Sequence, residues 1–89
     1  MKKYINIEDQ RYQYQVVNTV NGHSIEVLVV PNDYIAALTP EVAHTLGVTL
    51  PPDFRMAWPH GKVAEAEKEL TRLAQLNGWT EVTKIAPSE

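Results

Sequence analysis

The three histidines are the residues that most readily suggest chemistry. His23, His44 and His60 could ligate a metal, transfer protons or activate a nucleophile. No two of them are four residues apart, as in the helical zinc motif, and they fall on three different expected elements. The chain has no cysteine, which excludes disulfides, thiolate metal sites and cysteine nucleophiles. We therefore expect neither a metal nor another cofactor.

A nucleophile and its base are suggested by Ser24, which directly follows His23. Neighbouring residues of a strand point to opposite faces, so this pair cannot act together. A grouping of His44 or His60 with Asp53 stays open, because catalytic residues need not be neighbours in sequence. There is no glycine-rich phosphate loop, and a chain of 89 residues leaves little room for an enclosed pocket. We expect no enzyme, and a small hydrolase is the third functional hypothesis.

Residues 54–60 gather Phe, Arg, Met and Trp, which are enriched at interface hot spots. The alternative is an ordinary core strand followed by a helix start, because small domains use their few aromatic residues in the core. Among the N-terminal tyrosines, Tyr12 and Tyr14 share the expected core face and leave Tyr4 free for contact. The amides of the helix start after His60 could bind one anion with help from Arg55, but a permissive helix start at Gly61 beside a solvated Lys62 is the interpretation that we favour. The expected partner-binding residues are Arg55, Trp58, His60, Lys62 and Tyr4.

Composition and charge narrow the classes of protein. With 44% hydrophobic and 21% charged residues, the chain can build a core. A net charge of -3, with 8 basic residues spread along the chain, gives no basic footprint for nonspecific nucleic-acid binding. No apolar stretch has the length of a secretory signal or a membrane span, so we expect cytoplasmic residence and no membrane partner.

The Asn21-Gly22 dipeptide predicts a β-hairpin, because both central residues of a type I′ turn need positive φ. We expect strands over residues 12–20 and 23–30 joined by this turn. On the core-facing side the opposed pairs would be Val20 with His23, Asn18 with Ile25, Val16 with Val27 and Tyr14 with Val29. The other side mixes polar and apolar residues, which suits water or partial cover.

Capping residues predict the helices. Thr39 and Pro40 suit the start of a short helix that ends at Gly47, and Asp33 could cap a preceding turn over 34–37, giving one broken helix. A long amphipathic helix is expected over residues 62–77, followed by a stop at Asn77-Gly78. Its apolar stripe consists of Val63, Ala66, Leu70, Leu73 and Ala74.

Short strands complete the expected architecture. A strand-like alternation covers residues 54–58, a final strand covers 80–85, and an extra N-terminal strand over 3–7 is an alternative. Residues 86–89 should form a disordered tail. We expect residues 1–89 to form one two-layer α+β domain, with three or four mostly antiparallel strands and two helices packed on one face.

The leading functional hypothesis is a small non-enzymatic protein-binding module that inhibits or regulates a larger protein or complex. In size, lack of cysteine and lack of catalytic motifs, the chain resembles the small stand-alone inhibitors and accessory proteins of phages and plasmids, including anti-CRISPR proteins. That resemblance implies action through contact with a larger molecule. The alternative is a nucleic-acid-binding accessory protein that uses Arg55, His60, Lys62 and an exposed sheet face.

Overall fold

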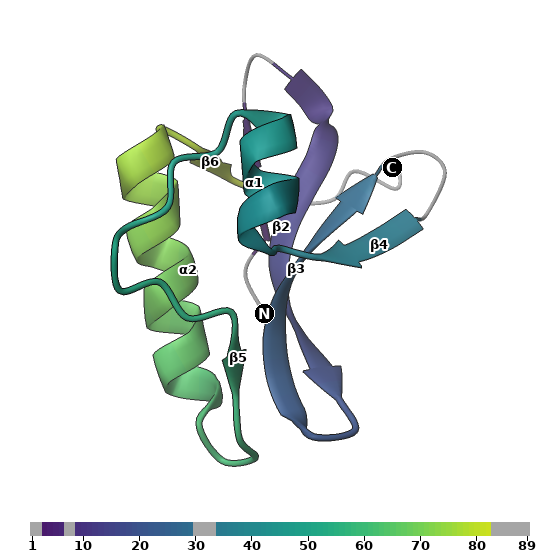
Figure 1. Cartoon of the computed structure of the whole chain (residues 1–89), viewed down its shortest axis with the longest axis vertical. Helices are drawn as coiled ribbons and strands as arrows, with labels where there is room; N and C mark the ends of the chain where they lie inside the picture. Colours follow the sequence, from purple (N-terminus) through teal and green to yellow (C-terminus); the bar gives the residue numbers. More distant parts are fainter. Residues whose placement is uncertain (1–2, 7–8, 30–33, 83–89) are drawn as a thin grey trace.

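The computed structural model describes residues 3–6, 9–29 and 34–82, which form an α+β fold with an antiparallel sheet and two helices (Figure 1). The elements are β1 (Lys3–Asn6), β2 (Asp9–Thr19), β3 (Gly22–Val29), β4 (Tyr34–Ala37), α1 (Pro40–Leu46), β5 (Ala57–Trp58), α2 (Val63–Asn77) and β6 (Thr80–Glu81). The strand order is β4-β3-β2-β1-β6, and β5 pairs separately with β3. The predicted class is confirmed, but six strands replace the three or four expected, because residues 34–37 form β4 instead of a turn of helix and the N-terminal strand, held as an alternative, is present as β1.

Strands β2 and β3 form the predicted hairpin, but its register differs from the expected one by two residues. Val16 lies opposite Ile25 instead of Val27, and Tyr14 lies opposite Val27 instead of Val29. A displacement of two residues preserves the face of every side chain, whereas a displacement of one would invert it. The inward residues Tyr14, Val16, Ile25 and Val27 are therefore buried as expected.

The turn is centred on Val20 and Asn21, not on the Asn-Gly dipeptide. Val20 is consequently 92% exposed at the tip instead of joining the core face. Gly22 follows the turn with φ 142 and packs against backbone. A Cβ atom on Gly22 would overlap the carbonyl oxygen of Trp58 and lie 2.8 Å from the carbonyl carbon of Pro59. The glycine thus serves a close approach between two chain segments.

Strand β3 forms hydrogen bonds along both of its edges. Strand β2 covers one edge, while β5 pairs with residues 23–24 and β4 with residues 26–29 on the other. Between them, the Ile25 amide donates to the Met56 carbonyl at 2.7 Å, and the Ile25 carbonyl accepts from the Leu38 amide at 3.1 Å. The fully buried Ile25 is therefore the point where two distant segments meet.

Helix α1 begins and ends where its capping residues predict. Thr39 Oγ1 accepts a hydrogen bond from the Val42 amide at 3.2 Å, and Gly47 adopts a left-handed conformation after the last turn. The preceding segment, however, is strand β4, so the predicted turn of helix over 34–37 is wrong. Pairing with the open edge of β3 outweighs the weak local helix signal. Asp33, its expected cap, lies outside the described residues.

Helix α2 confirms the predicted apolar stripe and the stop at Asn77-Gly78. Ala66, Leu70, Leu73 and Ala74 are buried, and Val63 is half-buried at the first turn. Both helices contribute to one core with the inward face of the sheet, and Figure 1 shows them on the same side of it. Neither described helix is long and apolar enough to cross a membrane.

The segment after α2 packs against the sheet beside this core. The ring of Trp79, just after α2, stacks on Tyr14 with centroids 3.8 Å apart and planes 6° apart. The expected N-terminal strand is present as β1, although Ile7 lies outside the described residues. The expected final strand is described only as β6, because residues 83–85 and the tail 86–89 also lie outside.

Replacing Gly22 tests whether this close approach sets the hairpin register. Gly22→Ala should lower the free energy of unfolding by more than about 2 kcal/mol, because the new Cβ meets backbone that cannot rotate away. Gly61→Ala is the matched control. Gly61 also has positive φ, at 87°, but nothing lies within 4 Å of its added Cβ, so only backbone strain of about 1 to 2 kcal/mol is expected. Equal losses in urea unfolding would contradict a steric role for Gly22.

Candidate functional site

The structure divides the five predicted partner-binding residues into two groups. Tyr4 and Trp58 belong to the core, each with 6% of its surface exposed. The expectation that Tyr4 is free for contact is wrong, because β1 pairs with β2 and turns this ring inward beside Tyr14. Arg55, His60 and Lys62 are exposed and stay available to a partner.

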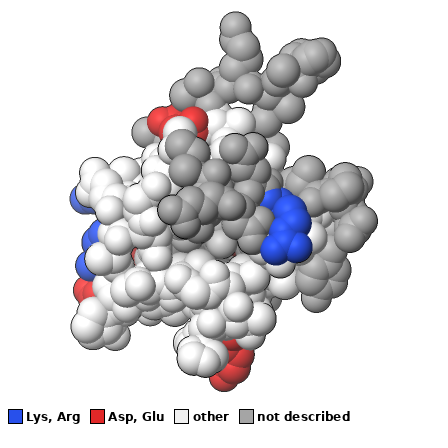
Figure 2. All heavy atoms as spheres, turned by 90° about the horizontal axis from the view of Figure 1, so that it is seen from above, with Lys and Arg blue, Asp and Glu red and all other residues white. Residues whose placement is uncertain are grey.

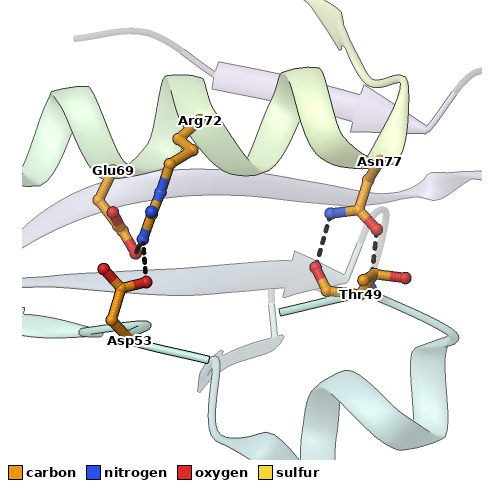
Figure 3. A network of polar contacts seen from close by, with 5 residues as sticks. All are labelled: Thr49, Asp53, Glu69, Arg72 and Asn77. Carbon is orange, nitrogen blue, oxygen red and sulfur yellow. Dashed lines mark hydrogen bonds and ion pairs between the residues drawn. The ribbon is translucent and has the colours of Figure 1, made fainter. Parts of the chain in front are cut away.

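Most of the site is built by residues 47–56, here called the connecting segment, which runs from α1 to β5. The side chain of Asn77, in the last turn of α2, holds this segment at Thr49 (Figure 3). Its Oδ1 accepts from the Thr49 amide at 2.8 Å, and its Nδ2 donates to the Thr49 carbonyl at 2.9 Å. Nδ2 also donates to the Leu73 carbonyl at 2.9 Å. One amide thus replaces a missing strand partner and ties it to the last turn of α2.

A second attachment joins the connecting segment to the middle of α2. In Figure 3, Arg72 lies between two carboxylates, and its guanidinium donates to Asp53 and Glu69 at 2.9 Å each. The hydrogen bond from Arg72 lowers the pKa of Asp53, and the bonds to Glu69 and Asp53 raise the pKa of Arg72. Arg72 and Asp53, which join α2 to the segment, are exposed, so this ion pair orients the segment more than it stabilises the fold.

Hydrophobic contacts hold the inner side of the connecting segment. Val48, Leu50 and Phe54 are half-buried and pack against the core. The predicted alternation over residues 54–58 is present as a burial pattern, but only Ala57–Trp58 form a strand. Phe54 and Met56 point inward and Arg55 points outward. The segment is therefore fixed at several places while it carries Arg55 to the surface.

Arg55 is the exposed group that these contacts position most fully. Its Nη2 donates to the Ala57 carbonyl at 3.3 Å, and its guanidinium carbon lies 5.7 Å from the centre of the Trp58 ring. No carboxylate among the residues described pairs with Arg55. Most of its N–H donors therefore remain open to an outside acceptor.

An open trough of about 1000 Å³ lies next to Arg55. The trough is lined by two flanks of α2. One flank faces the connecting segment and carries residues 65, 69 and 72, and the other lies near Tyr4 and carries residues 67 and 71. The trough therefore follows the outer surface of α2 instead of entering the core, a shape suited to another chain. Its lining includes Asp53, Arg55, Trp58, Glu65, Glu67 and Arg72.

The trough also contains a buried polar atom that the sequence does not indicate. Glu67 Oε1 is buried and has no hydrogen-bond partner. An orphaned carboxylate oxygen loses its hydration without compensation, which costs stability. The sequence also gives no sign of the roles of Asp53 and Arg72. Asn77 is recognisable in it only as part of a helix stop.

The structure brings two of the three histidines together. His23 on β3 and His60 after β5 have ring centroids 6.3 Å apart, whereas His44 lies on α1. No group of three potential metal-ligating side chains occurs within the described ranges. Ser24 donates to Glu26 at 3.0 Å, and Asp53 binds Arg72, so neither serves a histidine.

Changing Asn77 tests its attachment to the connecting segment. Asn77→Ala removes three hydrogen bonds and should lower the free energy of unfolding by about 1 to 3 kcal/mol. Asn77→Asp should be no better, because it places a carboxylate against two carbonyl oxygens. Gln75→Ala, an exposed change on the same helix, should stay within about 0.5 kcal/mol of the parent chain. If Asn77→Ala is as mild in urea unfolding, the attachment contributes nothing.

The Asp53 carboxyl should titrate below 3.8, its ordinary value, because Arg72 stabilises the charged form. A lowered folded-state pKa stabilises the fold above the unfolded-state pKa, and this contribution is lost as pH falls through the folded-state pKa. The attachment should therefore persist at neutral pH and weaken only in acid. NMR titration of the carboxyl carbon measures the midpoint, which Arg72→Gln should raise toward 3.8. An unchanged midpoint in Arg72→Gln would rule out this cause.

Known proteins offer no guide to the use of this surface. No family model, no curated protein and no solved structure matches the chain. Its function must therefore be argued from the geometry of its own residues.

Proposed function

We propose that this protein is a non-enzymatic binding module that docks on a larger protein through the trough beside Arg55 and so inhibits or regulates it. The observation that carries the proposal is the state of Arg55: exposed, oriented over the Trp58 ring, and without a carboxylate partner among the described residues. An arginine held in this way loses little conformational freedom on binding, which favours affinity.

The form of the trough supports a macromolecular partner. A small-molecule site normally encloses most of its ligand, whereas this trough is open and bends around a helix. Around Arg55, the carboxylates of Asp53 and Glu69 are both held by Arg72, so neither pairs with Arg55. An outside carboxylate or carbonyl would therefore find the Arg55 donors open, with Trp58 as a rigid support beside them.

The distribution of charge favours a protein partner over nucleic acid. The net charge is -3, and the face in Figure 2 shows separate basic and acidic side chains among uncharged ones. Of the basic residues near the trough, Arg72 pairs with Asp53 and Glu69, and Lys62 pairs with Glu65 at 3.6 Å, which leaves Arg55 and Lys68 without a carboxylate partner among the described residues. A continuous row of unpaired cations, which phosphate backbones require, is not formed by these residues.

The test compares Arg55→Glu with the unchanged chain as baits for proteins of the source cell, with identification of captured proteins by mass spectrometry and confirmation with the purified partner. Arg55→Glu should leave the melting temperature nearly unchanged and weaken binding of the partner more than about tenfold, or 1.4 kcal/mol. Trp58→Ala should instead reduce stability by about 3 to 5 kcal/mol, because the ring is buried.

Arg11→Glu is a matched control, because Arg11 also lies over an aromatic ring, 5.2 Å from the centre of Tyr12, but does not line the trough. It should leave partner binding unchanged. Full-strength binding by Arg55→Glu would exclude this site. Micromolar binding of generic DNA or RNA by the parent chain, weakening steeply with salt, would replace the protein partner with a nucleic acid.

A further inference from the structure

We infer that His23 and His60 form an open, two-histidine site for a borderline divalent cation such as Zn²⁺. The histidines are 37 positions apart in sequence, and only the pairing of β3 with β5 brings them together. In that pairing His23 lies opposite Trp58, which places His60 two residues beyond, in the diagonal position next to His23. Their ring centroids are 6.3 Å apart, with planes at 73°.

Hydrogen bonds give each ring the protonation pattern that a metal ligand needs. His60 Nε2 lies 3.0 Å from the Val20 carbonyl oxygen, which can only accept, so Nε2 carries the proton and Nδ1 keeps a lone pair. His23 Nδ1 lies 2.9 Å from Asn18 Oδ1, so Nδ1 donates and Nε2 keeps a lone pair. Metal-binding histidines usually donate their other N–H to an oxygen in this way.

The separation of the rings is slightly wider than a shared tetrahedral cation requires. Two Zn–N bonds of about 2.0 to 2.1 Å at a tetrahedral angle, added to the ring dimensions, place the centroids of two ligating rings roughly 5 to 5.5 Å apart. The observed centroid distance is 6.3 Å, so the side chain of the exposed His60 must move toward His23 by about 1 Å to share an ion. The backbone on both sides is held, since Gly22 packs on Trp58 and Pro59, and the Lys62 amide donates to the Pro59 carbonyl at 3.2 Å. Binding therefore requires a side-chain adjustment and little ordering of the backbone.

Two protein ligands leave the cation with open positions. A tetrahedral ion would keep two sites for water or for a ligand from another molecule. Beside His23 the surface has a small hollow of about 300 Å³, lined by Thr19, Asn21, Ala57, Trp58 and Pro59, where such a ligand has room. The imidazoles must be neutral to ligate, so binding should weaken as pH is lowered.

Titration of Zn²⁺ into the full chain, without a histidine tag, tests the site by calorimetry and by NMR of the imidazole ring protons. We expect saturation at one equivalent, shifts confined to the His23 and His60 rings, and a higher melting temperature with metal. Mg²⁺, which prefers oxygen ligands, should have no effect. Absence of saturable binding, or shifts confined to other residues, would overturn the inference.

Variants separate this site from adventitious binding. His23→Asn and His60→Asn should each abolish saturable Zn²⁺ binding while they keep a cooperative melt, and Asn18→Ala should weaken it about tenfold through loss of the bond that orients His23. His44→Asn is the control, because His44 is exposed on α1 and should not contribute. Binding that survives either His23→Asn or His60→Asn, or that His44→Asn also abolishes, would overturn the site.

Discussion

The close contact of Gly22 with the backbone of Trp58 and Pro59 is the constraint on which the rest of the structure depends. It allows β5 to lie against one edge of β3. At Ile25, next to β5, the pairing partner on this edge changes from β5 to β4. A strand with both edges bonded and a fully buried isoleucine at that point tolerates no slip in register. The hairpin turn therefore forms where this contact allows, and Val20 is left in solvent at the tip.

Both candidate sites follow from this arrangement, because both flank the two-residue strand β5. Arg55 lies just before the strand and His60 just after it, while the Trp58 ring fills the core between them. The strand contributes little surface of its own. Its ladder with β3 nevertheless positions a guanidinium at one end and an imidazole at the other, each beside a partner from another element.

The connecting segment shows how irregular backbone can present a side chain rigidly. Its carbonyls and amides have no strand partner over most of its length, so the Asn77 amide provides substitutes at Thr49. Half-buried apolar residues on its inner side hold it to the core, and the Arg72 network fixes its outer side. Of these, packing and the Asn77 bonds carry most of the stability, because exposed ion pairs contribute little.

Features that depend on neighbours in the chain are readable from the sequence. Thr39 and Gly47 bound α1, the spacing of Leu70 and Leu73 identifies the inward face of α2, and alternation along β2 and β3 assigns their faces. Each of these signals acts within one or two turns of helix or across a single strand, so local physical chemistry is sufficient.

Only the tertiary structure decided which distant segments meet. The two-residue change of register, the conversion of 34–37 from an expected helical turn to β4, and the burial of Tyr4 all result from backbone pairing between separate segments. The meeting of His23 with His60 and of Asp53 with Arg72 has the same origin. Two requirements set such pairings: every buried amide needs a hydrogen-bond partner, and two backbones can touch this closely only where a glycine lacks a Cβ. Neither requirement leaves a periodic pattern in the sequence.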